Sequence, residues 1–571
     1  MSETTESKEL ISKEVVESYI FSTVRHDFGI YSERLLLRLV ELAQCEINGL
    51  DFKGGTDLGK VTVGPWGHAE IVIPVKDILS GEDDTNYTKA KQSVRGLMGK
   101  FLEFEDDNTY KATHILNHVD VDKVAGKMVI QVNVNVWNAM LDFSKGFRKY
   151  ELETANIIGE GLPVWFNARR SDAAASLNLH GLPTAKQEQY LHSNIERLVE
   201  GEWEQYFVTR RHPDPTPLLP EADAYRVELR NGRAANEALK VSAEGAIYGS
   251  LCTAACSAEY GAIVERWLDS AADMSDATTA LTRMFVQDGA FIYLPAGVEM
   301  QSPIVIDSAY HTDGESEMCF AQALVVAEES ARGEVIVTHR SEGAGRIVVG
   351  FTREAIVGKA ADIKITELYD LQQNCSIVNN NYITQTGKSH CATMCCKTGD
   401  GYVRAAYNTA LTEPEAVSDV WALYLCSGEE HCDINMAARH LAPDCRSYSL
   451  VKGVASGTAM GSFAGMVYVA QDAQRTDAQQ QSRNLLLSDT ARIFTQPQLE
   501  IYADDVKCTH GATVGQLDDE AIYYMRQRGL SEQQARRLQI EGFAYDVVQH
   551  CGCPNMCRYI SELTAKKLEK M

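Results

Sequence analysis

Short apolar, β-rich runs recur through the middle of the chain, separated by Gly, Asn, Asp or Pro. They are FIYL (291–294), PIVI (303–306), ALVVA (323–327), EVIVTH (334–339), RIVVG (346–350), DIKITEL (362–368), DVWALYLC (419–426) and MVYVA (466–470). A spacing of about 10–15 residues permits either a β-sandwich or a parallel β-solenoid. About 200 residues of such strands, with no hairpin dipeptides between them, favour the solenoid.

Helical patterns flank this region on both sides. One helical stretch is predicted from about Ser250 to Phe285, and others over Glu520 to Arg528 and Ser531 to Ala544. Ser531 fits an N-cap, and Gln534 three residues later completes a capping box.

The first 155 residues follow a different pattern. Ser18 to Glu46 and Thr88 to Phe101 have apolar residues at helical spacing, whereas Glu70 to Val75, Phe101 to Glu105 and Met128 to Val136 alternate as strands do. Two helices followed by a hairpin predict a winged helix, a variant of the DNA-binding helix-turn-helix. Its candidate DNA contacts are Lys89, Lys91, Arg95 and Lys100.

Composition changes that picture in one respect. Residues 1–155 hold 18 Lys plus Arg against 25 Asp plus Glu, a net charge of −7, and the whole chain has a net charge of −25. Both values argue against tight binding of DNA or of an anionic membrane, because neutralised phosphates supply much of that affinity. With no 18-residue apolar run and no basic-then-apolar start, we expect a cytoplasmic protein whose 15 cysteines are mostly reduced.

The strongest candidate chemistry lies in PQLEIYADDVKCTHGATVG, residues 497–515. Cys508 and His510 are two residues apart, so on a strand their side chains leave the same face, with Cα atoms about 6.5–7 Å apart. A thiolate and an imidazole so placed suit iron or an iron–sulfur cluster. Asp504 and Asp505 either orient His510 as hydrogen-bond acceptors or are solvated turn residues. The alternative for the pair itself is a packed thiol and a histidine bonded to backbone.

This motif, with NLLLSD (484–489) before it and YMRQRGL (524–530) after it, resembles the SufD-type scaffolds of the SUF iron–sulfur cluster assembly machine. The resemblance covers about residues 160–571. It implies a right-handed parallel β-helix, a SufB-type partner subunit that shares the cluster site at Cys508 and His510, and a SufC-type ATPase on the C-terminal helices. Sulfur would come from a donor through the complex. It also implies a transient iron–sulfur cluster as cargo and associates reduced flavin with the complex, although no motif identifies a flavin site.

The N-terminal part resembles the first winged-helix domain of plasmid Rep-type replication initiators. The resemblance rests on SYIFSTVRHDFGIYSERLLLRLVELAQ (18–44) and VWNAMLDFSKGFRKYELETA (136–155). Such initiators continue into a second winged helix, whereas here the sequence from about residue 160 resembles the SufD-type scaffold instead. DNA binding, a relic that only folds, and a fusion that performs neither job all remain open.

A cysteine-rich segment near the C-terminus departs from the SufD-type pattern. HCGCPNMC (550–557) places Cys551, Cys553 and Cys557 beside His550, a ligand set for zinc or iron. Its spacing matches no strong template, and Pro554 is a plausible first residue of a helix, which makes packed thiols the alternative.

The sequence therefore predicts a multidomain α+β chain. It comprises a winged helix (1–155), a helical region (156–285), a parallel β-helix (286–518) and a C-terminal helical region (519–571). No phosphate-binding loop, dinucleotide fingerprint or hydrolase elbow is present, so we expect a scaffold without an ATP site of its own rather than an enzyme.

Overall fold

The computed structural model describes residues 162–571 except 185–186, 200–223, 237 and 315. Before residue 162 it describes 39, 57–61, 67–74, 101–105, 110–114, 116–122, 127–134 and 137. The chain divides into two compact units, residues 1–157 with 174–181, and residues 158–173 with 182–571. No helix in the described parts of the chain is long and apolar enough to cross a lipid bilayer.

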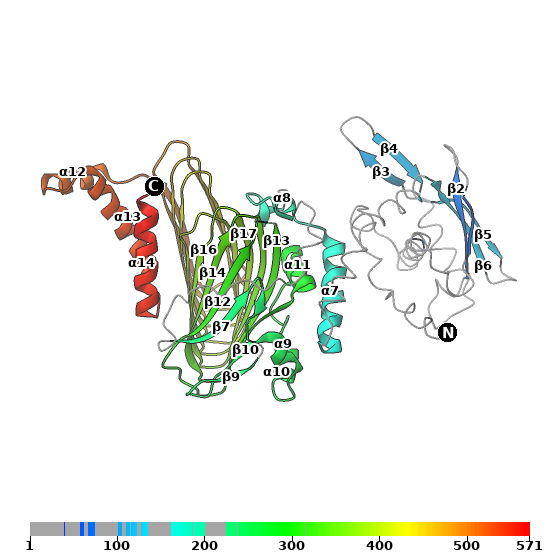
Figure 1. The fold of residues 1–571 in the computed structure, drawn as a ribbon, viewed down its shortest axis with the longest axis horizontal. Coiled ribbons are helices and arrows are strands. Elements are labelled where there is room, and N and C mark those ends of the chain that lie inside the picture. The colour runs from blue at the N-terminus through cyan, green and yellow to red at the C-terminus, as the bar shows by residue number, and fades with distance from the viewer. Residues whose placement is uncertain are drawn as a thin grey trace. The chain divides into compact units, whose positions relative to one another are not determined.

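The first unit contains a four-stranded antiparallel sheet in the order β1-β2-β6-β5 and a separate hairpin of β3 and β4 (Figure 1). The strands are β1 (Asp57–Val61), β2 (His68–Pro74), β3 (Phe101–Glu105), β4 (Tyr110–His114), β5 (Leu116–Asp122) and β6 (Lys127–Asn133). Alternate residues of β2 and β6, such as Ile71 and Ile130, are buried, as a one-sided sheet requires. The predicted strands are confirmed. The predicted basic helix, with Lys89, Lys91, Arg95 and Lys100, lies outside the described residues.

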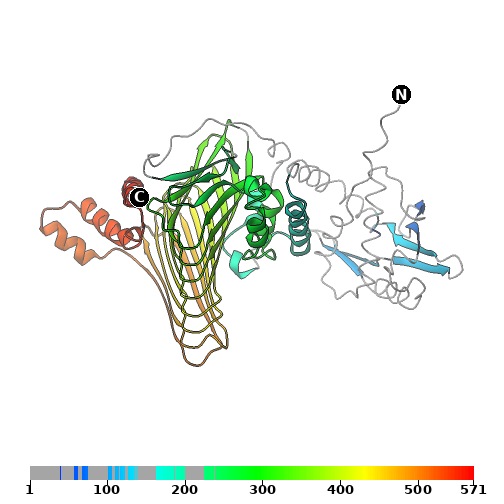
Figure 2. The same cartoon turned by 90° about the horizontal axis from the view of Figure 1, so that it is seen from below.

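The second unit is a parallel β-solenoid in which the chain alternates between two ten-stranded sheets (Figure 2). The first sheet runs β25-β23-β21-β19-β17-β15-β13-β11-β10-β9, and the second runs β26-β24-β22-β20-β18-β16-β14-β12-β7-β8. Pairing is parallel from β11 to β25 and from β7 to β26. The predicted solenoid is confirmed, but its two sheets begin before residue 286, because β7 to β10 lie within the region predicted to be helical (156–285).

The strands of the first sheet are β9 (Lys240–Val241), β10 (Ile247–Ser250), β11 (Asp288–Leu294), β13 (Glu317–Ala327), β15 (Ile347–Val357), β17 (Cys375–Gln385), β19 (Tyr402–Leu411), β21 (His431–His440), β23 (Met460–Val469) and β25 (Arg492–Ile501). Those of the second are β7 (Tyr225–Arg230), β8 (Arg233–Ala234), β12 (Ile304–Thr312), β14 (Arg332–Gly343), β16 (Asp362–Asp370), β18 (His390–Lys397), β20 (Val417–Cys426), β22 (Arg446–Ala455), β24 (Asp477–Leu486) and β26 (Lys507–Gly515).

One corner of the solenoid is built the same way in successive turns. Each turn places one residue in the left-handed region, and its amide donates to a carbonyl one turn further on. The left-handed residues are Gly297, Ser330, Ala360, Lys388, Glu415, Asp444 and Arg475. Most of them are not glycine, so each stores strain of about 1 kcal/mol that the corner hydrogen bonds offset. These corner hydrogen bonds join each turn of the solenoid to the next turn.

The core lies between the two sheets and is mainly aliphatic. It also encloses charged groups, and Glu367 is fully buried there. Burial alone would raise the pKa of Glu367, but the Arg353 guanidinium and hydrogen bonds from His339 and Tyr407 lower that pKa to about 2. The runs of apolar residues in the sequence did not indicate that charged side chains such as Glu367 are buried in the core.

Helices cover the outer face of each sheet. On the first sheet lie the N-terminal part of α7 (Val164–His180) and α9 (Leu251–Cys256), α10 (Gly261–Trp267) and α11 (Ala277–Phe285). The predicted stretch from Ser250 to Phe285 is thus helical but broken into three helices. A 3-10 turn, η1 (Glu188–Tyr190), and α8 (Ile195–Val199) follow α7.

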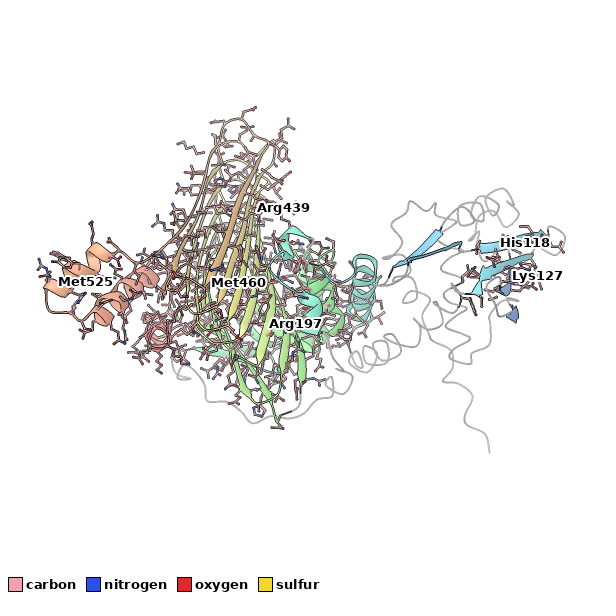
Figure 3. The ribbon with its side chains drawn as sticks, turned by 90° about the horizontal axis from the view of Figure 1, so that it is seen from above. His118, Lys127, Arg197, Arg439, Met460 and Met525 are labelled. Atoms are coloured by element: carbon pink, nitrogen blue, oxygen red, sulfur yellow. The ribbon has the colours of Figure 1, made fainter. Side chains whose placement is uncertain are left out.

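On the second sheet, α13 (Glu532–Val548) and α14 (Pro554–Leu568) bury Ile540, Val547 and Met556 against β12 to β22. The shorter α12 (Asp519–Gln527), with Met525, lies further from the solenoid (Figures 1 and 3). The predicted capping box of Ser531 and Gln534 is present, and Pro554 begins α14 as predicted.

Candidate functional site

The solenoid has an open end at its last turn, which β25 and β26 form. Each is the terminal strand of its sheet, so one backbone edge of each is unpaired among the residues that the structure describes. The pairing of neither strand is interrupted by a bulge, and charged residues are few, with Arg492 and Glu500 on β25 and Lys507 on β26. Pro497 removes one backbone donor from β25. Natural proteins normally cover or blunt such long edges, because unpaired backbone groups recruit further strands.

Cys508 and His510 lie on β26 and face the solenoid interior at this open end. They are in register with Ala478 and Gln480 of β24, both of which are buried. Because parallel neighbours in register point to the same side, the thiol and the imidazole share that inward face. The predicted common face is therefore confirmed by the geometry of the strand.

The two side chains differ in exposure, because no further turn stacks on β26. Cys508 is half-buried against Val467, Val469 and Ala478, and this burial raises the pKa of its thiol. His510 is exposed. A protonated thiol is a poor metal ligand, so loading a metal on Cys508 requires release of a proton.

Asp504 and Asp505 occupy the corner between β25 and β26. The Asp505 carbonyl accepts from the Arg475 amide, at the position that Gln474 and its equivalents hold in earlier turns, and the Asp505 amide donates to the Gln474 side chain. Both carboxylates are exposed, and among the described residues neither is hydrogen bonded to His510. Their geometry here is that of turn residues.

Apolar side chains rim the same end of the solenoid. Their exposed fractions are 40% for Phe494, 38% for Ile501, 60% for Tyr502 and 41% for Val514. Sequence reasoning missed them, because an apolar residue on a strand looks the same whether or not another turn covers it. Exposed apolar side chains beside two unpaired edges are typical of an interaction surface.

This chain alone supplies two candidate ligands at the open end. In the described part of the chain, no group of three or more His, Cys, Asp or Glu side chains is arranged to hold a metal ion. An iron–sulfur cluster normally takes four protein ligands. Any cluster held at Cys508 and His510 therefore needs ligands from elsewhere.

The cysteines at 551, 553 and 557 pack between α13, α14 and the second sheet. The Cys551 thiol contacts the Thr366 hydroxyl at 3.7 Å, and burial raises its pKa to about 12. The Cys553 amide at the start of α14 donates to Glu334 at 3.0 Å. His550 stacks on Trp421 at 3.8 Å. These contacts account for the segment without a metal.

A second exposed apolar surface lies on the C-terminal helices. Tyr523 and Tyr524 of α12 are 63% and 57% exposed, and Leu538 and Tyr545 of α13 are 51% and 56% exposed. Since the opposite side of α13 packs on the solenoid, these side chains face away from it.

Comparison with known proteins settles the family. Residues 310–543 match the model described as "SUF system FeS cluster assembly, SufBD core domain", and residues 144–306 match "SufBD protein N-terminal region". The chain belongs to the SufBD family. The SufBD core match contains β25 and β26, and so Cys508 and His510.

Individual SufBD relatives agree. The chain is 30% identical over 296 residues to a SufBD family protein of Synechocystis, covering 49% of this chain and 64% of the relative. It is 39% identical over 151 residues to SufD of Escherichia coli, covering 26% and 36%, and 26% identical over 334 residues to SufD of Bacillus subtilis, covering 57% and 75%. The chain thus spans between about a third and two thirds of the length of the first two relatives. Residues 14–158 match "Initiator Replication protein, WH1", in line with the predicted resemblance of that part.

Proposed function

We propose that the chain is a SufD-type scaffold subunit that pairs through the open end of its solenoid with a SufB-type subunit. The observation that carries this proposal is the last turn, where two unpaired strand edges and an apolar rim surround Cys508 and His510. The unpaired strand edges, the apolar rim and the incomplete set of cluster ligands each indicate that a second chain binds at the open end of the solenoid.

The cluster is the cargo of this site. Cys508 and His510 provide one soft and one borderline ligand, and the SufB-type subunit completes the set with its own side chains. In the isolated chain the raised pKa of Cys508 keeps the thiol protonated at neutral pH. Iron binding at Cys508 therefore releases that proton, and assembly is favoured as pH rises.

The exposed surface of α12 and α13 is the proposed docking site for a SufC-type ATPase. Four large apolar side chains lie there, and the sequence holds no phosphate-binding loop of its own. ATP-driven approach of two such ATPases would move the interface between the SufB-type subunit and this chain. That movement would open the cluster site at Cys508 and His510, which the interface buries. Reduced flavin in the complex stays a prediction without an assigned residue.

The winged-helix part supports a second candidate, DNA binding in the manner of replication initiators, because residues 14–158 match that family. Its net charge of −7 opposes tight binding, and a non-productive fusion of the two parts is the third candidate.

Size-exclusion chromatography with light scattering separates these candidates. The full chain is co-expressed with SufB-type and SufC-type subunits, beside a variant that lacks residues 1–155. A stable complex of one D, one B and two C subunits supports the scaffold. A complex formed only by the shortened chain identifies a fusion that blocks assembly, and no complex from either one favours DNA binding.

Replacing His510 with Ala tests the site itself. Because His510 is exposed and makes no hydrogen bond or ion pair with the residues that the structure describes, His510→Ala should leave the complex intact while cluster yield in a reconstituted system falls by about tenfold or more. Thr509→Ala is the matched control, since Thr509 faces away from the interior on the same strand. Normal cluster yield from His510→Ala would remove this residue from the proposed site.

A further inference from the structure

A cavity of about 210 Å³ lies on the outer face of the first sheet, away from the inward face that carries Cys508 and His510. The segment Glu188 to His192 forms its roof. Strands β21, β23 and β25 form its floor, which Asp433, Ser462, Ala464 and Phe494 line. Met460, labelled in Figure 3, lies two residues before Ser462 on β23.

Strand register explains why a hollow exists there. Arg404, Asp433, Ser462 and Phe494 occupy one row across β19, β21, β23 and β25. The next row places Ala464 between Asn435 and Gln496. Two small side chains on β23 thus lie between larger ones on its neighbours, and the depression follows the middle strand.

The roof is held rigidly over this depression. The Ser193 hydroxyl donates to Asp433 at 2.5 Å, and the Glu188 carboxylate accepts from Gln496 at 2.6 Å and from Gln498 at 2.5 Å. The rings of His192 and Phe494 stack at 4.2 Å. The cavity is therefore preformed rather than dependent on a ligand to order it.

The polar groups around the cavity accept hydrogen bonds more than they donate them. Asp433 is 3% exposed, and its carboxylate already accepts from Ser462 at 2.7 Å, from Asn435 at 3.1 Å and from Ser193. The Ser462 hydroxyl donates its only hydrogen in that bond, so its oxygen can take part in further hydrogen bonds only as an acceptor.

The charge count at the cavity is also negative. Arg404 lies 3.6 Å from Asp433 and stacks over Tyr190 at 3.9 Å, so it balances one carboxylate. Among the described residues no cation pairs with Glu188, an exposed carboxylate that accepts hydrogen bonds from two side-chain amides. One net negative charge and an aromatic wall of His192 and Phe494 favour a small cation.

We propose that this cavity binds the primary ammonium group of a small aliphatic amine, between Asp433, Glu188 and the His192–Phe494 wall. A volume of about 210 Å³ is about seven times the ~30 Å³ that one water molecule occupies in the liquid, which suits a short amine. The proposal does not rest on the proposed scaffold function, because none of the cavity residues lies on β26, but Phe494 belongs to both the cavity wall and the apolar rim.

Isothermal titration of the full chain with 1,4-diaminobutane tests the proposal, with 1,4-butanediol as the uncharged isostere. We expect binding of the diamine and at least tenfold weaker binding of the diol. Nα-acetyl-lysine amide is a third probe. If it binds at least tenfold more tightly than the diamine, the ammonium group comes from the side chain of another protein.

Two variants locate the binding. Ala464→Leu fills the hollow and should abolish diamine binding, and Asp433→Asn should weaken it at least tenfold. Asp472→Asn, an exposed carboxylate in the turn after β23, is the control and should bind as the parent does. Because Asp433→Asn removes the partner of Arg404, its fold is checked by circular dichroism, and Ala464→Leu carries the test if it fails to fold. Equal binding of diamine and diol, no diamine binding at millimolar concentration, or binding that survives Ala464→Leu overturns the proposal.

Discussion

At the residue scale, a single histidine ties together three strands of the second sheet. His390 of β18 contacts Asp362 of β16 and Asp419 of β20, each at 3.0 Å, and these two hydrogen bonds raise its pKa to about 9. The folded pKa lies above the ordinary value near 6.5, so the stabilisation is complete below about pH 6.5 and is lost as pH rises through about 9.

His390→Gln should therefore cost about 1 kcal/mol at pH 6 and almost nothing near pH 9.5, the figure being modest because the side chain is 37% exposed. Urea unfolding followed by tryptophan fluorescence at both values of pH measures this. A loss that is the same at both values would mean that shape, not charge, makes this contact.

The left-handed corner makes an opposite prediction, a gain in stability. Ala360 is exposed and has a φ of 55°, which an L side chain tolerates poorly. Ala360→Gly relieves that strain at the cost of a more flexible unfolded chain, and we expect a net stabilisation of about 0.5 kcal/mol. Lys359→Gly, one residue earlier without a left-handed φ, should instead destabilise. The same urea experiment compares them, and a loss from Ala360→Gly contradicts the strain argument.

At the element scale, α14 is held on the solenoid by a buried ionic cluster. Lys567 contacts Asp400 at 2.7 Å and Glu430 at 2.5 Å, and Lys397 reaches Glu430 as well. Lys567 is buried, so removing its charge uncovers a desolvated carboxylate.

Lys567→Met keeps the aliphatic stem and should cost about 2 kcal/mol, with faster hydrogen exchange confined to α14. Lys570→Met is the control, because Lys570 is 65% exposed and lies 3.5 Å from Asp400; it should change stability by less than about 0.5 kcal/mol. Unchanged exchange in α14 after Lys567→Met would show that apolar packing alone holds the helix.

At the scale of the whole molecule, local sequence patterns predicted the helices and strands better than they predicted which side chains those elements bring together. The β-rich runs and the Ser531 capping box depend on nearby residues, so the sequence predicted them. The polar core around Glu367 and the hollow over Ser462 arise from pairing between strands about 30 residues apart. Cys551 and Cys553 show the same limit. Their spacing suggested ligands, and only the position of α14 on the sheet reveals that they are packed.

The two proposed docking surfaces, the open end of the solenoid and the exposed side of α12 and α13, are separate. Whether each binds only its own partner subunit can be tested. Tyr502 lies on the rim of the open end, and Tyr523 lies on α12. Tyr502→Asp places a charge in the proposed B–D interface and should weaken binding of a SufB-type subunit about tenfold or more, while binding of a SufC-type ATPase is unchanged. Tyr523→Asp should do the reverse. Because both side chains are mostly exposed, neither change should unfold the chain.

Pull-down of each subunit alone by the full-length variants measures the two affinities separately, with Val164→Asp, at an 87% exposed position on α7, as a control for added surface charge. If either tyrosine variant lost both subunits or neither, the open end and the C-terminal helices would not be independent docking surfaces. In the double variant each subunit should bind as weakly as it does to the corresponding single variant, because the two sites share no residue.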